Sequence, residues 1–314
     1  MSDTQGHPSK PLKIGLIGGT GLADALAAEQ TAEAGGRGVE TVHPDTPFGK
    51  PSSPIVQTRW AGVDICIIQR HGPGHVYNPS TVPYRANVFA LKALGCTHVL
   101  ASGATGSLRE AIAPGHLVIV DQIIDKTHRR ESTFYDAACG AAVHTELSEP
   151  CCPVMRTWLI ESAEAADHDL HVHDGGTYVC MEGPAFSTKA ESEMHRQWGG
   201  DLIGMTAMPE ARLAREAELP YALIGLPTDY DCWRPHDPTR PQHELLNEII
   251  GNLKQASANA IALIQQALKD PTPLTKQPCL GEDALKLAIW TDKTKIPPER
   301  VERLRPLWGR YFER

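Results

Sequence analysis

Short apolar runs alternate with stretches of helical spacing along most of this chain, and this alternation constrains its fold more than any other feature of the sequence. The apolar runs have the length of buried strands, and the stretches between them repeat apolar residues every three or four positions. Strands are expected at residues 13–17, 55–60, 63–69, 97–102, 117–124, 172–181 and 221–227. Helices are expected at residues 83–94, 153–166, 188–198, 209–217 and 242–268. Strands and helices in alternation indicate an α/β fold built on one central sheet.

No linker divides the chain before Pro271, so we expect a single domain over residues 1–270. The 314 residues are enough to bury a full core. Three prolines between residues 270 and 278 interrupt the pattern, and residues 271–314 are expected to form a helical appendage packed on the same or a neighbouring subunit. In the last long helix, one apolar stripe is expected to face the core: Leu245, Leu246, Ile249, Ile250, Leu253, Ile261, Ile264 and Leu268.

The net charge of −8 and the lack of a long apolar run limit the expected partners. An acidic chain does not favour non-specific binding to nucleic acid, which depends on pairing phosphates with Lys and Arg. An anionic substrate would therefore need a local cationic pocket. The segment from Met1 to Leu12 is polar, unlike a signal peptide, and no run reaches membrane-spanning length. We expect a cytoplasmic protein without nucleic-acid or membrane partners.

The cysteines and a histidine-rich segment are expected to be structural. Eight cysteines without Cys-x-x-Cys spacing predict reduced thiols, and adjacent Cys151 and Cys152 are expected in the core, with a redox role as the alternative. His168, His171 and His173 do not match zinc-site spacing, so a solvated strand edge is expected there, and no metal.

Three small or cationic loops follow expected strands. Gly18–Gly21 includes the Thr20 hydroxyl, Arg70 and His71 follow the strand at 63–69, and Ser102–Ser107 is small and polar. Glycine lets backbone amides approach an anion, and arginine suits a planar anion contact. The glycine spacing does not fit a dinucleotide fingerprint. As the alternative to anion binding, tight structural turns alone would explain these glycines. Together the three loops predict one phosphate site.

Two carboxylates, Asp229 and Asp231, follow the apolar run Tyr221–Pro227. Ligands of open α/β sheets collect at the carboxyl ends of strands, and one of two neighbouring carboxyl groups can hold a proton while the other stays ionised. The alternative is a solvated turn, because Asp is common in turns.

Several motifs in order resemble one enzyme family. The runs Tyr178–Ser187, Gly204–Glu210 and Thr228–Trp233 are similar to those of the trimeric purine nucleoside phosphorylases, and specifically of their methylthioadenosine phosphorylase branch. The resemblance extends from about Lys13 to Leu268. It implies a mixed, twisted sheet flanked by helices in a single domain.

The resemblance also implies an activity. Inorganic phosphate would act as co-substrate on the purine nucleoside 5'-methylthioadenosine, giving adenine and 5-methylthioribose 1-phosphate without a cofactor. A broader adenosine or 6-oxopurine nucleoside phosphorylase remains the alternative, as does a hydrolase that uses water. An oxidoreductase is disfavoured by the glycine spacing, and a non-catalytic nucleoside-binding module would not need Arg70, His71 and Thr206.

Site roles follow from the resemblance, motif by motif. Phosphate would be held by Thr20, Arg70, His71, the Ala104 backbone and Thr206. Met205 would bind the ribose, and the base would be bound by Phe186, Ser187, Asp229 and Asp231. The 5' substituent would lie against His75, His144, Leu245 and Leu246, with His144 supplied by a neighbouring subunit. A homotrimer with active sites at subunit interfaces is therefore implied.

The expected base contacts favour adenine over 6-oxopurines. Ser187 stands where the 6-oxopurine branch typically has Glu, and the Asp pair replaces an Asn. A carboxylate accepts from an amino group but cannot donate to a carbonyl. We expect Asp229 to protonate N7, with its pKa raised by burial and by Asp231. Gly103 and Ala207 replace hydroxyl-bearing residues of the family, and this predicts either weaker phosphate binding or binding that depends more on backbone amides.

Overall fold

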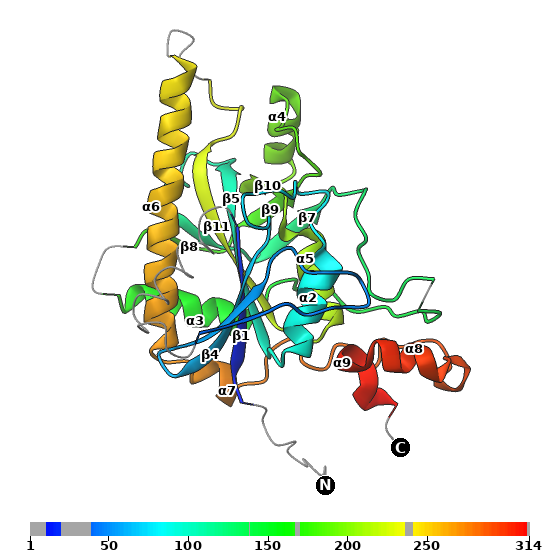
Figure 1. The fold of residues 1–314 in the computed structure, drawn as a ribbon. Helices are drawn as coiled ribbons and strands as arrows, with labels where there is room; N and C mark the ends of the chain where they lie inside the picture. Colours follow the sequence, from blue (N-terminus) through cyan, green and yellow to red (C-terminus); the bar gives the residue numbers. More distant parts are fainter. Residues whose placement is uncertain (1–10, 20–38, 138, 167–169, 236–240, 313–314) are drawn as a thin grey trace.

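A central mixed sheet organises the computed structural model, which describes residues 11–19, 39–137, 139–166, 170–235 and 241–312. Within that part of the chain the sheet has 11 strands, in the order β2-β3-β4-β1-β5-β10-β9-β7, with β11 pairing β5 and β6, and β8 pairing β6 (Figure 1). The strands are β1 Lys13–Gly18, β2 Glu40–Val42, β3 Ile55–Trp60, β4 Val63–Gln69, β5 His98–Ser107, β6 Leu117–Ile119, β7 Gln122–Asp125, β8 Val172–Asp174, β9 Thr177–Cys180, β10 Leu202–Gly204 and β11 Tyr221–Tyr230. The predicted α/β fold with a single mixed sheet is confirmed.

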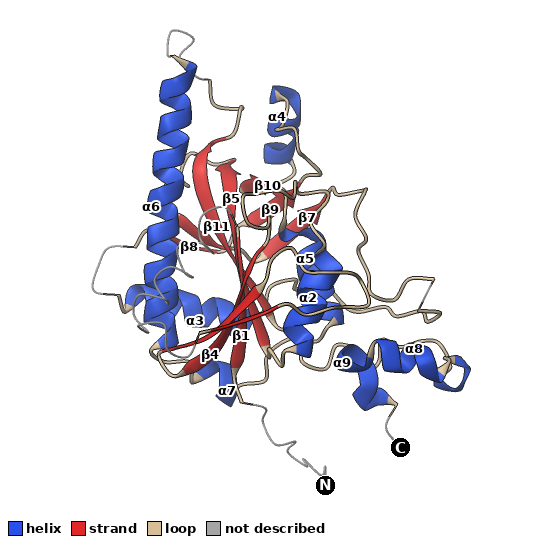
Figure 2. Ribbon diagram, in the orientation of Figure 1, coloured by secondary structure: helices blue, strands red, loops and turns tan. Residues whose placement is uncertain are grey.

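Helices cover both faces of this sheet (Figure 2). They are α2 Tyr84–Ala93, α3 Pro153–Glu164, α4 Lys189–Gln197, α5 Ala207–Glu216, α6 Gln242–Leu268 and α7 Pro273–Lys276. Side chains alternate along β11: Tyr221 and Leu223 join the core under α2 and α5, whereas Ala222 and Ile224 join the core under α3 and α6. The apolar run therefore reads as a strand because both of its faces are buried.

Two predicted strand boundaries were wrong at the site edge. Residues 102–107, expected as a loop, continue β5, and β11 extends to Tyr230, so that Asp229 lies within a strand. The two strands pair in parallel from Val99 opposite Tyr221 to Ser107 opposite Tyr230. Because this pairing satisfies backbone groups of a glycine-rich segment, pairing overrides its low strand propensity.

Two other predicted strands are each broken in two. Residues 117–124 divide into β6 and β7, and residues 172–181 divide into β8 and β9. Gly175 and Gly176 adopt φ of 89° and 157°, and the Gly176 amide donates to Asp121 Oδ1 at 2.8 Å. This turn moves the chain from the β6–β8 pair to the β7–β9 pair, where the ladder resumes.

Helix α6 has the predicted bounds, but its apolar stripe joins the core only in the second half of the helix. Ile264 and Leu268 are buried, whereas Leu246 is 57% and Ile250 is 42% exposed. The first half of α6 extends beyond the sheet at the top of Figure 1, and most of its described side chains are exposed.

Residues after Pro271 form short helices, α8 Pro298–Arg303 and α9 Arg305–Trp308, with 3-10 turns η1 Lys293–Lys295 and η2 Gly309–Tyr311. Trp308 is fully buried, with its ring centroid 5.0 Å from that of Tyr135. The segment thus packs on its own chain, beside α2 (Figure 1). None of the helices that the structure describes is long and apolar enough to cross a membrane.

Candidate active site

The loops expected to bind phosphate meet at one edge of the sheet. Strand β1 lies between β4 and β5 and pairs both in parallel, so the carboxyl ends of all three are adjacent. A Cβ added to Gly19 would lie 3.1 Å from the Ser102 carbonyl oxygen and 3.2 Å from Arg70 Nη1. Such close approach of three strand ends depends on glycine. Thr20 lies outside the described residues.

Arg70 is buried and held in one orientation. Its Nε and Nη2 donate to the two oxygens of Glu210 at 2.7 and 2.9 Å, and Nη1 donates to the Ser102 carbonyl at 2.8 Å. Tyr221 also donates to Glu210, at 2.9 Å. Burial by itself lowers the pKa of Arg70, but the Glu210 carboxylate more than reverses this and leaves the pKa above its ordinary value. The guanidinium is thus always charged and already oriented.

His71 is a neutral imidazole with a defined tautomer. Its Nδ1 lies 2.8 Å from the Tyr77 carbonyl oxygen, which can only accept, so Nδ1 carries the proton and Nε2 the lone pair. Burial, and then the Arg70 charge, lower the pKa of His71 to about 4. The exposed His75 ring stacks on it, with centroids 4.2 Å apart and 18° between planes.

Thr206 faces the phosphate edge from the other side. It is the residue before α5, and its Oγ1 would lie 3.5 Å from a Cβ added to Gly103. Its amide donates to the Tyr178 hydroxyl at 3.3 Å. Ala104, the next residue of β5, is exposed. A side chain at position 103 would therefore fit between β5 and Thr206 at ordinary van der Waals distance.

The Asp pair lies at the adjacent strand end. Asp229 is opposite Gly106 in the β11–β5 ladder, and its Oδ1 accepts from Thr228 Oγ1 at 2.8 Å. Asp231 is 8% exposed, its amide donates to the Ser107 carbonyl at 3.0 Å, and its Oδ2 has no hydrogen-bond partner among the residues described. A buried carboxylate oxygen without a donor suits a substrate amino group.

Ser187 and Asp231 are brought together, but Phe186 is not enclosed. The Cys232 thiol donates to the Ser187 carbonyl at 3.3 Å, which joins the loop before α4 to the loop after β11. The Ser187 hydroxyl donates to Met181 Sδ at 3.7 Å. The Phe186 side chain is 85% exposed, so its ring presents an open apolar surface.

The residues expected around the 5' substituent do not form one pocket within the chain. Leu245 and Leu246 lie on the first half of α6, where Leu245 is half-buried and Leu246 is exposed. The exposed His144 ring packs against Trp290 with centroids 4.7 Å apart. The loop of His144 extends from the sheet on the side opposite α6 (Figure 1).

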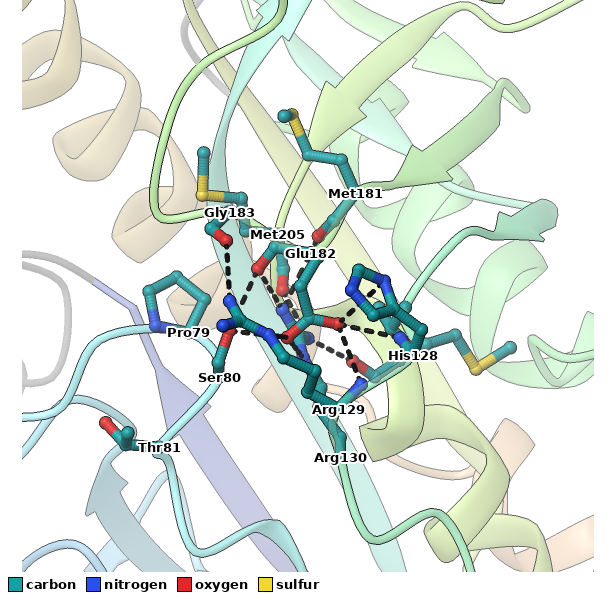
Figure 3. A network of polar contacts seen from close by, with 12 residues as sticks. Pro79, Ser80, Thr81, His128, Arg129, Arg130, Met181, Glu182, Gly183 and Met205 are labelled. Carbon is teal, nitrogen blue, oxygen red and sulfur yellow. Dashed lines mark hydrogen bonds and ion pairs between the residues drawn. The ribbon is translucent and has the colours of Figure 1, made fainter.

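A buried network centred on Glu182 lies beneath Met205 (Figure 3). Glu182 accepts from the Ser80 hydroxyl and, at 2.7 Å, from the His128 amide, while Arg130 Nε lies 3.3 Å from it. Burial by itself raises the pKa of Glu182, but hydrogen bonds from Ser80 and His128, with the charge of Arg130, lower it to about 2. Glu182 is therefore ionised at all ordinary pH values.

Arg130 connects that network to the ribose and phosphate residues. Its Nη1 donates to the carbonyl oxygens of Met205 and Met208 at 2.6 Å each, and its Nη2 to the Glu182 carbonyl at 2.7 Å. Thr206 lies between the two methionines, so one guanidinium fixes the backbone on both sides of it. Glu182 and Glu210 stand within motifs of the sequence but no role was predicted for either, and no sequence signal pointed to Arg130.

The histidine-rich segment lies at a sheet edge on β8. His173 Nε2 is 2.9 Å from His116 Nδ1, and the exposed His171 ring is 4.9 Å from the His116 ring. His168 lies outside the described residues.

Comparison with known proteins gives matches over nearly the whole chain. A family model described as the phosphorylase superfamily matches residues 13–269. The S-methyl-5'-thioadenosine phosphorylase of Geobacter sulfurreducens is 43% identical over 300 residues, covering 95% of this chain and 98% of that protein. A crystal structure of a methylthioadenosine phosphorylase from an Antarctic soil metagenomic library has a TM-score of 0.83 and 40% identity, covering 95% and 99% of the two chains. A Schistosoma mansoni methylthioadenosine phosphorylase in complex with adenine has a TM-score of 0.76 and 34% identity, covering 89% and 99%.

Proposed function

Because the chain belongs to the phosphorylase superfamily, among its S-methyl-5'-thioadenosine phosphorylases, we propose that it cleaves 5'-methylthioadenosine with inorganic phosphate. The products are adenine and 5-methylthioribose 1-phosphate. The observation that carries this proposal is that strands β4, β1, β5 and β11 are neighbours in the sheet. Their adjacent carboxyl ends bring Arg70, Gly19 and Gly103 to the same edge as Asp229.

Phosphate binds at the edge formed by Arg70, His71, Thr206 and the backbone of Ala104, with Thr20 as the proposed fifth contact. Arg70 supplies a fixed cation, and Thr206 supplies a hydroxyl donor. His71 Nε2 is an acceptor, so it accepts a hydrogen bond from the protonated oxygen of hydrogen phosphate. A phosphate oxygen forms a bond to the anomeric carbon while the bond from that carbon to N9 of the purine breaks.

The electron pair of the broken bond moves onto the purine, and a proton must reach N7. Asp229 donates that proton and is ionised when the base leaves. Asp231 Oδ2 accepts from the adenine amino group, and Ser187 donates to N1. The Phe186 ring supplies the stacking surface, which the bound base covers.

Met205 binds the ribose, and Arg130 positions it. The contacts of Arg130 to Met205 and Met208 fix the backbone that carries Thr206, which joins ribose and phosphate binding through one rigid turn. The reaction needs no cofactor, because phosphate is the nucleophile and the purine ring accepts the charge.

The 5' substituent is enclosed at a subunit interface of a homotrimer. The support is that Leu246 is exposed on the first half of α6, while the exposed His144 ring packs on Trp290 and not beside Leu246. Such a site takes His75, Leu245 and Leu246 from one subunit and His144 from the next. The proposed location is the cytoplasm, where phosphate is plentiful.

One assay tests the activity. Phosphorolysis of 5'-methylthioadenosine, adenosine and inosine is compared side by side, with and without phosphate. We expect phosphate-dependent release of adenine from methylthioadenosine, slower cleavage of adenosine and negligible cleavage of inosine, because a 6-oxo group would face Asp231 without a donor. Equal rates for inosine and methylthioadenosine would refute the amino-purine assignment, and cleavage without phosphate would refute phosphorolysis.

A further inference from the structure

A second group of reactive side chains lies at the end of the sheet away from the proposed active site. His98 begins β5, whose other end carries Ser107 beside the Asp pair. The ring nitrogen of His98, the thiol of Cys279 and the carboxylate of Glu282 all lie within 4.8 Å of one another. Cys279 follows α7, which is at the lower end of the sheet in Figure 1.

Contacts of Thr97 define the tautomer of His98. Thr97 Oγ1 donates its one proton to the Lys13 carbonyl at 3.1 Å and accepts from the Lys13 amide at 3.1 Å. Its contact with His98 Nδ1, at 2.9 Å, must therefore use a proton on that nitrogen. The lone pair of Nε2 then faces Cys279 Sγ, 3.4 Å away. A metal-bound histidine characteristically donates its other ring N–H to an oxygen in this way.

Cys152 lies next to this group of three, beside Cys279. The Cys152 and Cys279 thiols are neighbours, and both side chains are buried. Cys152 is the residue before α3, and its amide donates to the Tyr221 carbonyl at 2.7 Å, so its backbone is fixed by β11. Segments far apart in sequence thus bring one imidazole, one thiol and one carboxylate together, with the Cys152 thiol beside Cys279.

We propose that His98, Cys152, Cys279 and Glu282 bind a zinc ion that ties the C-terminal segment to the sheet. Nitrogen, thiolate and carboxylate are the ligands that zinc takes, and structural zinc sites have four of them. Two donors on one tetrahedral zinc, at its usual Zn–N and Zn–S distances, lie about 3.6 Å apart. The distance of 3.4 Å between His98 Nε2 and Cys279 Sγ is close to that separation.

A hydrogen bond from the Cys279 thiol to His98 explains that one contact without a metal. That hydrogen bond involves neither the Glu282 carboxylate nor the neighbouring Cys152 thiol, whereas a zinc ion engages both as ligands. On binding, the two thiols release their protons to solvent, and zinc takes their place between the donors.

The expected consequence is structural. The segment from residue 279 onward carries Leu285, Leu307 and Trp308 into the core beside α2 and α5. Zinc would fix the start of this segment to β5 and α3, so its removal should loosen the C-terminal helices while leaving the distant strand ends in place.

Metal content tests the proposal. The full chain is purified without chelator, and zinc is measured by plasma mass spectrometry, with about one ion per chain expected for a structural site. Cobalt is then exchanged into the protein, and we expect the thiolate-to-cobalt charge-transfer band and visible bands typical of tetrahedral coordination. Cys279→Ser and His98→Asn should lose both signals; the asparagine amide can still donate to Thr97. Cys139→Ser, which removes a buried thiol elsewhere, should keep both.

Three results would overturn the proposal. They are a wild-type chain that takes up neither zinc nor cobalt, a Cys279→Ser variant that keeps both, and a native protein in which Cys152 and Cys279 are joined as a disulfide in peptide mass spectra. The wild-type cobalt spectrum does not depend on the variants, so a variant that fails to fold leaves the test intact. Phosphorolysis is not the readout, so the outcome is also independent of the proposed activity.

Discussion

Replacing Asp229 with Asn separates proton donation from every other role of this residue. Asn keeps an oxygen that can accept from Thr228 Oγ1, as Oδ1 does now at 2.8 Å, and it keeps the size of the side chain. The strand pairing around position 229 is made by the backbone and should be unaffected. The change therefore removes the transferable proton with little cost to the fold.

The expected loss is that of a general acid. Positioned proton transfer contributes roughly 10² to 10⁴ in rate, which corresponds to about 3 to 5 kcal/mol of transition-state stabilisation. We expect kcat for methylthioadenosine to fall by that factor while its KM changes little, because the ground-state contacts of Ser187 and Asp231 remain.

A substrate with an activated leaving group provides the control. A ribosyl substrate that releases nitrophenolate needs no proton on its leaving group, so Asp229→Asn should cleave it as fast as the wild type does. Equal losses on both substrates would show that Asp229 acts by orientation, and a loss of less than a few fold on methylthioadenosine would refute the acid role.

Three further changes test other parts of the structure. Gly103→Thr places a hydroxyl near Thr206 without a steric clash, because the added Cβ would lie at ordinary contact distance. One added hydrogen bond to the charged phosphate, worth about 1.5 kcal/mol, should lower the phosphate KM roughly tenfold in steady-state assays. An unchanged phosphate KM would contradict this. Arg130→Lys cannot reach the Met205 and Met208 carbonyls together and should lower kcat/KM by about tenfold or more in a chain still folded by circular dichroism, with the phosphate KM rising; full activity would limit Arg130 to a role in folding. Burial raises the pKa of Glu216 from 4.5 to about 7. Between these two pH values the carboxyl group ionises in the unfolded chain but not in the folded one, so the free energy of unfolding should fall by about 3 kcal/mol as pH rises from 4.5 through 7. Glu216→Gln should therefore be more stable than wild type to urea at pH 8.5 and equal at pH 4.5, whereas exposed Glu164→Gln should match wild type at both; no gain at pH 8.5 would contradict the assigned pKa.

The sequence predicted those elements whose signals are local. The strands at 55–60 and 63–69 were placed correctly, because two apolar runs are separated by Gly62 in a left-handed turn. The end of β5 was not, because a run of glycine, serine and threonine reads as a loop until its pairing with β11 is known. Helix α6 was predicted over its full length, but the amino-acid pattern cannot tell a stripe buried in its own chain from one left uncovered.

The site shows the same limit. Arg70 and Asp229 follow apolar runs and could be proposed from position alone, although their roles stay predictions. The Glu182 network and the cluster around Cys279 could not be found, because their members are far apart in sequence and gather through the fold. The expectation of no metal rested on the spacing of the histidines near residue 171, and it did not consider His98 at all.

The tautomer of His71 decides which oxyanions the site accepts. Its Nδ1 proton is committed to the Tyr77 carbonyl, and its pKa of about 4 leaves Nε2 unprotonated at neutral pH. Hydrogen phosphate and hydrogen arsenate have an O–H that can donate a hydrogen bond to Nε2. Sulfate has no O–H, so one of its oxygen lone pairs would face the Nε2 lone pair. The chain should therefore use arsenate in place of phosphate, and sulfate should compete poorly with either.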